Sequence, residues 1–121
     1  MKKPELITYK GKQVIYLDFS DLKNERQIQQ LTKASGSYIQ KHRINSVLVL
    51  TNIKNMYFNN ELRMEFINTS KNNGPYIKAS AIIGLYGLAS FVFDDFLKQA
   101  GRKISVMKTK EQALEYLVTL D

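Results

Sequence analysis

Few side chains in this 121-residue chain are of the types that carry out acid–base or metal chemistry. His42 is the one histidine, and it falls at the end of a predicted helix, where a positive ring is favoured and a surface or capping role is expected. Asp94 and Asp95 are adjacent carboxylates, but neighbours on a helix point about 100° apart and cannot easily share a proton or a metal ion. Asp18 ends a predicted strand, where sites of α/β proteins collect, yet no second acid is placed beside it. We therefore expect no catalytic residue and no metal site.

The segment Gly84-Leu-Tyr-Gly87 joins a predicted strand to a predicted helix, where backbone N–H groups could hold an anion. It lacks the third glycine of a dinucleotide-binding motif, and no Gly-Lys-Ser or Gly-Lys-Thr follows it. A tight turn that lets the helix and the strand pack closely is the interpretation we favour. No cofactor is expected.

Composition limits the class of protein. The chain is 44% hydrophobic and 24% charged, which is typical of a soluble globular protein, and its length predicts a single domain over residues 1–121. It has no cysteine, which excludes disulfides and thiolate chemistry. The N-terminal lysines precede no apolar stretch of the kind found in signal peptides, and no apolar run is long enough to cross a bilayer. We expect a cytoplasmic protein with no membrane span.

The formal net charge of +7 is the one unusual value. Such a charge can favour nucleic acids or anionic membranes. The 18 lysines and arginines are spread along the chain, however, and no basic run with interleaved aromatic residues appears. A solvated basic surface is the interpretation we favour, with nucleic-acid binding as an alternative.

Short apolar runs predict five β-strands. The run 14–19 is apolar on both faces, which is typical of a strand inside a sheet, and Lys10-Gly11-Lys12 before it suits a hairpin turn. The first strand is therefore expected to be an antiparallel edge strand. The predicted strands cover residues 6–9, 14–19, 46–51, 78–84 and 103–107.

Helical spacing of apolar residues predicts four helices between and after these strands. The first follows a cap at Asp21 or Asn24 and reaches about Arg43, with Gly36 allowing a close approach to the sheet. The second covers residues 61–70, the third residues 88–100, and the last begins at Thr109 with a capping box that pairs it with Gln112. The expected fold class is α/β, with a five-stranded, mostly parallel sheet in the order ββαβαβαβα and right-handed crossovers.

Large aromatic residues stand at positions where a solvated surface is expected. Tyr57 and Phe58 lie in a loop before the second helix, and they either fold onto the core or form part of a contact surface. Phe91 falls outside the apolar stripe of its helix, and the same two alternatives hold for it.

With this order of elements, the chain resembles the STAS-type fold of anti-sigma-factor antagonists. It is most similar to small bacterial STAS-like, SpoIIAA-like proteins, a group that also includes CRAL-TRIO lipid-binding domains. Three segments carry the resemblance: 78–84, 101–103 and 109–117. It implies a bacterial regulatory domain that binds other proteins.

In phosphorylated antagonists of this group, a serine motif at the start of a helix after the central strand is modified by a partner kinase. By spacing from Val47, the matching stretch is Tyr57-Phe58-Asn59-Asn60-Glu61-Leu62. Asn59 and Asn60 stand where the serines would be. The resemblance therefore implies a partner-binding face that lacks the phosphorylatable serine.

We expect a non-enzymatic domain that binds a protein partner or a second copy of itself, as in a homodimer. One alternative is binding of a lipid or another apolar small molecule, as the CRAL-TRIO likeness implies, and another is nucleic-acid binding. The candidate interaction surface comprises Tyr57, Phe58, Asn59, Asn60, Gly84, Tyr86, Gly87 and Phe91.

Overall fold

The structure is a computed structural model that describes residues 2–86, 98 and 104–120. The strands are β1 (Glu5–Tyr9), β2 (Lys12–Asp18), β3 (Val47–Asn52), β4 (Ile77–Ile83) and β5 (Ser105–Val106). The helices are α1 (Glu25–Ile39), α2 (Asn60–Asn73) and α4 (Lys110–Thr119), with a short 3-10 helix at Gly74–Tyr76.

Five strands form one sheet in the order β1-β2-β3-β4-β5, with β1 antiparallel to β2 and the other pairs parallel. This confirms the five-stranded, mostly parallel sheet and its antiparallel edge strand. The β1–β2 hairpin turns through Lys10 and Gly11, whose φ angles are 49° and 81°. Two consecutive positive φ angles are the geometry that matches the twist of paired strands, and glycine adopts one of them without strain.

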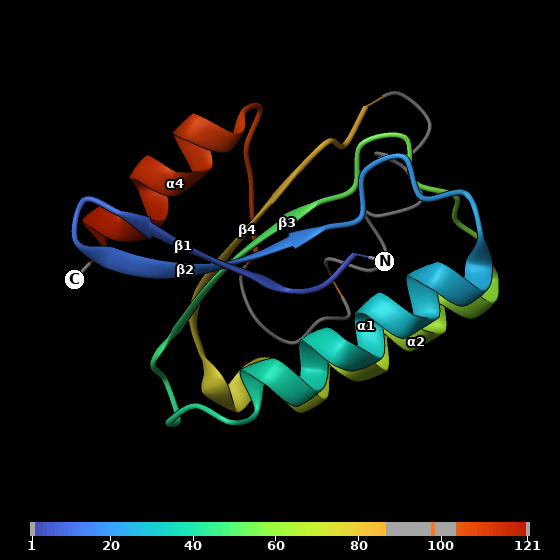
Figure 1. Cartoon of the computed structure of the whole chain (residues 1–121), viewed down its shortest axis with the longest axis horizontal. Helices are drawn as coiled ribbons and strands as arrows, with labels where there is room; N and C mark the ends of the chain where they lie inside the picture. The colour runs from blue at the N-terminus through green and yellow to red at the C-terminus, as the bar shows by residue number, and fades with distance from the viewer. Residues whose placement is uncertain (1, 87–97, 99–103, 121) are drawn as a thin grey trace.

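Helices cover both faces of the sheet (Figure 1), with α1 and α2 on one side and α4 on the other. Along β2, Ile15 and Leu17 face the α1–α2 side, whereas Val14 and Tyr16 face α4. All four are at most 6% exposed, so the prediction that this strand is apolar on both faces is confirmed.

The predicted number and order of helices are met only in part. The described residues contain three α-helices, in the order ββαβαββα, where four and ββαβαβαβα were expected. The predicted helix over 88–100 lies outside the described residues, apart from Lys98. The start of the predicted strand at 103 lies outside them too.

Helix α1 begins at Glu25 because Asn24 caps it, with its side chain accepting a hydrogen bond from the Gln27 N–H at 3.1 Å. The helix ends at Ile39, four residues earlier than the expected end near Arg43. The expected role of Gly36 was also wrong. An added Cβ there would meet Asn73, Gln40 and Thr69, so Gly36 faces α2 rather than the sheet.

Helix α2 is longer than predicted and runs to Asn73, where residues 61–70 were expected. Its last turn is tied to α1, because Gln40 Nε2 donates a hydrogen bond to Asn73 Oδ1 at 2.9 Å. Asn73 is thus a buried residue of the last turn of α2, although the Asn72-Asn73-Gly74-Pro75 sequence is typical of a turn. In α4 the predicted cap at Thr109 is confirmed, since its hydroxyl accepts from the Gln112 N–H at 3.1 Å.

Candidate functional site

The loops after β2, β3 and β4 meet at one edge of the sheet, because parallel neighbouring strands end on the same side. Main-chain hydrogen bonds continue past the strands and join these loops. Phe19 N–H donates to Asn52 O and Asp21 N–H to Lys54 O, both at 2.8 Å, and Ile53 N–H donates to Ile83 O at 3.0 Å. We call the surface formed by residues 19–24, 53–59 and 84–86 the strand-end surface.

Three residues of this surface have positive φ angles: Asp21 (61°), Asn55 (57°) and Gly84 (91°). Asn55 Nδ2 donates to Asp21 Oδ1 at 3.1 Å, which holds two of these turns together. At Gly84 an added Cβ would lie 2.4 Å from the Lys54 backbone nitrogen. Gly84 therefore allows two loops to touch, and the helix-to-strand packing that was favoured from sequence involves residues outside the described ones.

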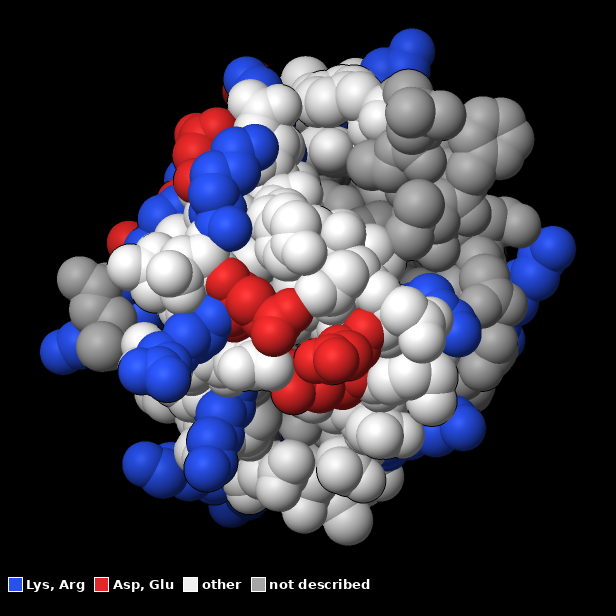
Figure 2. Space-filling model, turned by 90° about the vertical axis from the view of Figure 1, so that its right-hand side faces the viewer, with Lys and Arg blue, Asp and Glu red and all other residues white. Residues whose placement is uncertain are grey.

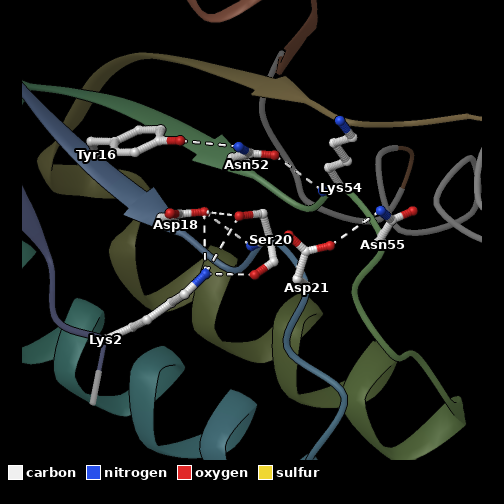
Figure 3. Close-up of polar contacts among 8 residues, drawn as sticks. All are labelled: Lys2, Tyr16, Asp18, Ser20, Asp21, Asn52, Lys54 and Asn55. Carbon is white, nitrogen blue, oxygen red and sulfur yellow. Dashed lines mark hydrogen bonds and ion pairs between the residues drawn. The ribbon is translucent and has the colours of Figure 1, made fainter.

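Asp18 lies at the centre of a polar network that reaches the N-terminal segment (Figure 3). Its carboxylate accepts hydrogen bonds from the Ser20 N–H at 3.0 Å and from the Ser20 hydroxyl at 2.5 Å. Lys2 Nζ lies 3.5 Å from the same carboxylate oxygen and donates to Ser20 O at 2.5 Å. Burial would raise the pKa of Asp18, but the Ser20 hydrogen bonds and the Lys2 charge outweigh it and hold that pKa below its ordinary value. Asp18 is thus an anionic anchor that orders the loop.

A second chain of contacts begins at Asn52, the last residue of β3 (Figure 3). Asn52 Nδ2 donates to the Tyr16 hydroxyl at 3.0 Å, and Asn52 Oδ1 accepts from the Lys54 N–H at 3.1 Å. Burial raises the pKa of the Tyr16 hydroxyl despite the hydrogen bond from Asn52. Sequence reasoning did not single out Lys2, Ser20 or Asn52. The one signal available was that Asp18 and Asn52 are polar residues ending apolar strands.

The two asparagines that were matched to phosphorylated serines lie at the start of α2. Asn59 is the N-cap, and its Oδ1 accepts a hydrogen bond from the Leu62 N–H at 2.8 Å. Its Nδ2 contacts Glu25 at the start of α1 and the Tyr57 hydroxyl. Asn60 is the first helical residue and accepts from Arg63 Nε at 3.2 Å. Asn59 therefore joins the first turns of both helices.

The predicted aromatic residues separate into two groups. Phe58 is half-buried, and its ring lies 5.8 Å from that of Phe66 in the α1–α2 core. Tyr57 is 43% exposed and Tyr86 is 58% exposed, on neighbouring loops of the strand-end surface. Gly87 and Phe91 lie outside the described residues. Among the predicted surface residues, Asn59 contacts Tyr57, and Gly84 touches the loop that carries both through Lys54.

The remaining candidates for chemistry lie apart from this surface. His42 Nδ1 is 3.0 Å from the Tyr38 carbonyl oxygen, just past the end of α1, so the predicted capping role is confirmed. Asp94 and Asp95 lie outside the described residues. Within the described ranges, no three side chains of the histidine, aspartate and glutamate types gather closely enough to hold a metal ion.

The strand-end surface has a charge distribution of its own. Figure 2 shows this end of the molecule, with acidic side chains gathered near its centre and basic ones mainly around them. Asp21 in the first loop and the first-turn residues Glu25 and Glu61 contribute acidic groups here. Lys23 and Lys54 lie in the same loops, so this end of the molecule carries both acidic and basic groups.

Comparison with solved structures identifies the fold. The chain superposes on an uncharacterised protein of the DUF3478 family with a SpoIIAA-like fold from Shewanella loihica, with a TM-score of 0.72 and 15% identity over 94% of this chain and 91% of that one. It also superposes on an anti-sigma-factor antagonist (STAS) domain protein from Planctomyces limnophilus, with a TM-score of 0.63 and 13% identity over 97% of this chain and 98% of that one.

No model of a protein family matches the sequence, and no curated protein matches it either. The chain has the SpoIIAA-like, STAS-type fold that its element order resembles. None of the helices in the described part of the chain is both long and apolar enough to cross a lipid bilayer.

Proposed function

We propose that this protein is a non-enzymatic regulatory domain of the cytoplasm that binds another protein through its strand-end surface. The observation that carries the proposal is the exposure of Tyr57 and Tyr86, at 43% and 58%, on adjoining loops. Tyrosine combines a large apolar ring with a polar tip, and it is enriched among the residues that dominate binding energy at interfaces.

The backbone that carries these tyrosines is well fixed for binding. The main-chain bonds between Asp21 and Lys54 and between Ile53 and Ile83 tie the three loops to one another. A further bond joins Tyr57 N–H to Leu22 O at 2.8 Å. Because these loops are already ordered, little conformational entropy is lost when a partner docks.

The strand-end surface carries both charges. Acidic groups lie near the centre of this face in Figure 2, and Lys23 and Lys54 belong to the same loops as Asp21. A protein partner with complementary charges around an apolar contact fits such a surface. We propose a different protein as the partner, and the test below distinguishes it from a second copy of this chain.

Binding is expected to be independent of phosphorylation at the start of α2. Anti-sigma-factor antagonists resemble this chain in fold, but Asn59 and Asn60 replace the serines of the matched motif. Asn59 also has a structural task there, since it caps α2 and contacts Glu25. The surface is thus proposed to be permanently competent to bind.

The test is a double substitution, Tyr57→Ala with Tyr86→Ala, because both rings are exposed and removing them spares the core. Proteins cross-linked to the wild-type domain in its source cells are identified, and the recovered partner is purified for calorimetry. We expect the double variant to bind at least about tenfold more weakly, as loss of interface tyrosines typically costs more than 1 kcal/mol.

Ile44→Ala is the matched control, since Ile44 is 73% exposed but lies between α1 and β3, away from the strand-end surface. It is expected to bind the partner like the wild type. Equal affinity of the double variant and the control would refute the proposal. A concentration-dependent dimer that the double variant abolishes would instead assign the surface to self-association.

A further inference from the structure

A cavity lies between the sheet and the helix pair α1–α2. Its volume is about 90 Å³. Leu17, Val49 and Ser80 line it from the sheet, and Thr32, Ser35 and Phe66 line it from the helices. Its lining also includes Phe19 and Ile53 from the loops of the strand-end surface, so a ligand bound in it would lie directly beneath that surface.

Ser80 is the unusual residue of this cavity. Its side chain is 6% exposed, and its Oγ has no hydrogen-bond partner within the described part of the chain. Val49 pairs with Ser80 across the sheet and is apolar, so the neighbouring strand offers no polar side chain at this register. A buried hydroxyl without a partner is costly, and natural structures keep few of them. A buried hydroxyl of this kind is satisfied by buried water or by a ligand that takes the place of the water.

Two further hydroxyls of the lining already donate hydrogen bonds. Thr32 Oγ1 donates to Ile28 O at 2.8 Å, and Ser35 Oγ donates to Leu31 O at 2.6 Å, both within α1. Each oxygen keeps lone pairs that can accept a further hydrogen bond. The polar side chains of Thr51, Thr69, Ser70 and Asn73 also line the cavity, so it combines polar groups with an apolar majority.

The lining also restricts the charge and the size of a ligand. No lysine, arginine, histidine, aspartate or glutamate occurs among the described residues that line the cavity. An ion would lose its hydration there without gaining a counter-charge, so the ligand is neutral. A lipid is too large, since pockets for drug-sized ligands measure about 300–1,000 Å³. A volume of about 90 Å³ corresponds to about three water molecules at about 30 Å³ each.

We propose that this cavity binds a small neutral molecule with a short apolar body and one hydroxyl or amide group, which hydrogen-bonds to Ser80 Oγ. The apolar body contacts Val49, Leu17 and Phe66. The hydroxyl or amide group of the ligand accepts a hydrogen bond from the Ser80 hydroxyl, and it can also donate one to an oxygen on that side of the cavity. Short-chain alcohols and amides have this chemistry.

The test uses 1-propanol as the probe and propionate as its charged counterpart of similar size. Titration of ¹⁵N-labelled protein is followed by the amide shifts of Thr32, Ser35 and Ser80. With 1-propanol we expect saturable shifts at these residues, and with propionate none. Ser80→Ala is expected to weaken 1-propanol binding about fivefold, the effect of losing one hydrogen bond.

Two further variants serve as controls for the binding measurement. Ser46→Ala removes a hydroxyl that bonds Arg43 O on the exposed surface, and it should bind 1-propanol like the wild type. Ser80→Val fills part of the cavity with a residue suited to a strand, and it should abolish binding. Well-dispersed spectra verify folding in each case. Unchanged binding by Ser80→Ala, equal binding of propionate, or no saturable shift in the wild type would each overturn the proposal.

Discussion

Gly84 and Gly36 differ in what surrounds them, although both are single glycines next to regular elements. Gly84 has a φ of 91°, and an added Cβ would lie 2.4 Å from the Lys54 backbone nitrogen. At Gly36 the nearest atom to an added Cβ, Asn73 Oδ1, is 3.6 Å away, which is an ordinary contact. The first glycine is required by the fold, and the second is only tolerated by it.

We expect Gly84→Ala to lower the free energy of unfolding by about 2 kcal/mol or more, because the left-handed backbone alone costs roughly 1–2 kcal/mol and the clash adds to it. Gly36→Ala is expected to raise the same quantity by about 0.5–1 kcal/mol, since alanine is the better helix former. Urea unfolding curves measure both. Destabilisation by Gly36→Ala would mean that α1 and α2 approach more closely than the structure shows.

At the scale of elements, α2 depends on its cap. Asn59 Oδ1 satisfies the Leu62 N–H, one of the first-turn groups that have no partner inside the helix. We predict that Asn59→Ala lowers the free energy of unfolding by about 1 kcal/mol, whereas Asn59→Ser, also a good cap, keeps most of it. Asn60→Ala is the control and should change stability by less than about 0.5 kcal/mol. Chemical denaturation compares the four proteins, and equal losses at Asn59 and Asn60 would contradict the capping role.

At the scale of the whole molecule, one sheet joins two apolar layers. Leu50 of β3 packs in the layer under α4, Leu62 of α2 packs in the layer between the sheet and the helix pair α1–α2, and both are fully buried. We expect Leu50→Ala and Leu62→Ala each to cost about 2–5 kcal/mol, and unfolding to remain a single transition because β2 and β3 contribute to both layers. Far-UV circular dichroism and tyrosine fluorescence should lose signal together. Separate midpoints would show that the α4 layer unfolds independently.

The strands were largely predictable from sequence. The runs 14–19 and 46–51 correspond closely to β2 and β3, because strands buried on both faces are apolar throughout. The caps at Asn24, Asn59 and Thr109 involve side chains that bond their own neighbours, so local sequence was enough to suggest them. The end of α2 was missed because the burial of Asn73 depends on Gln40, which is 33 residues away.

The pattern of apolar residues along the chain determined the α/β class and the antiparallel edge strand, since each element must bury its own apolar face. Tertiary structure alone decided that Asp18, Ser20 and Lys2 form one network, that Phe58 turns inward while Tyr57 stays exposed, and that Ser80 faces a cavity. Those outcomes depend on contacts between segments far apart in sequence. No local pattern records such contacts, because their energy arises only when the layers pack.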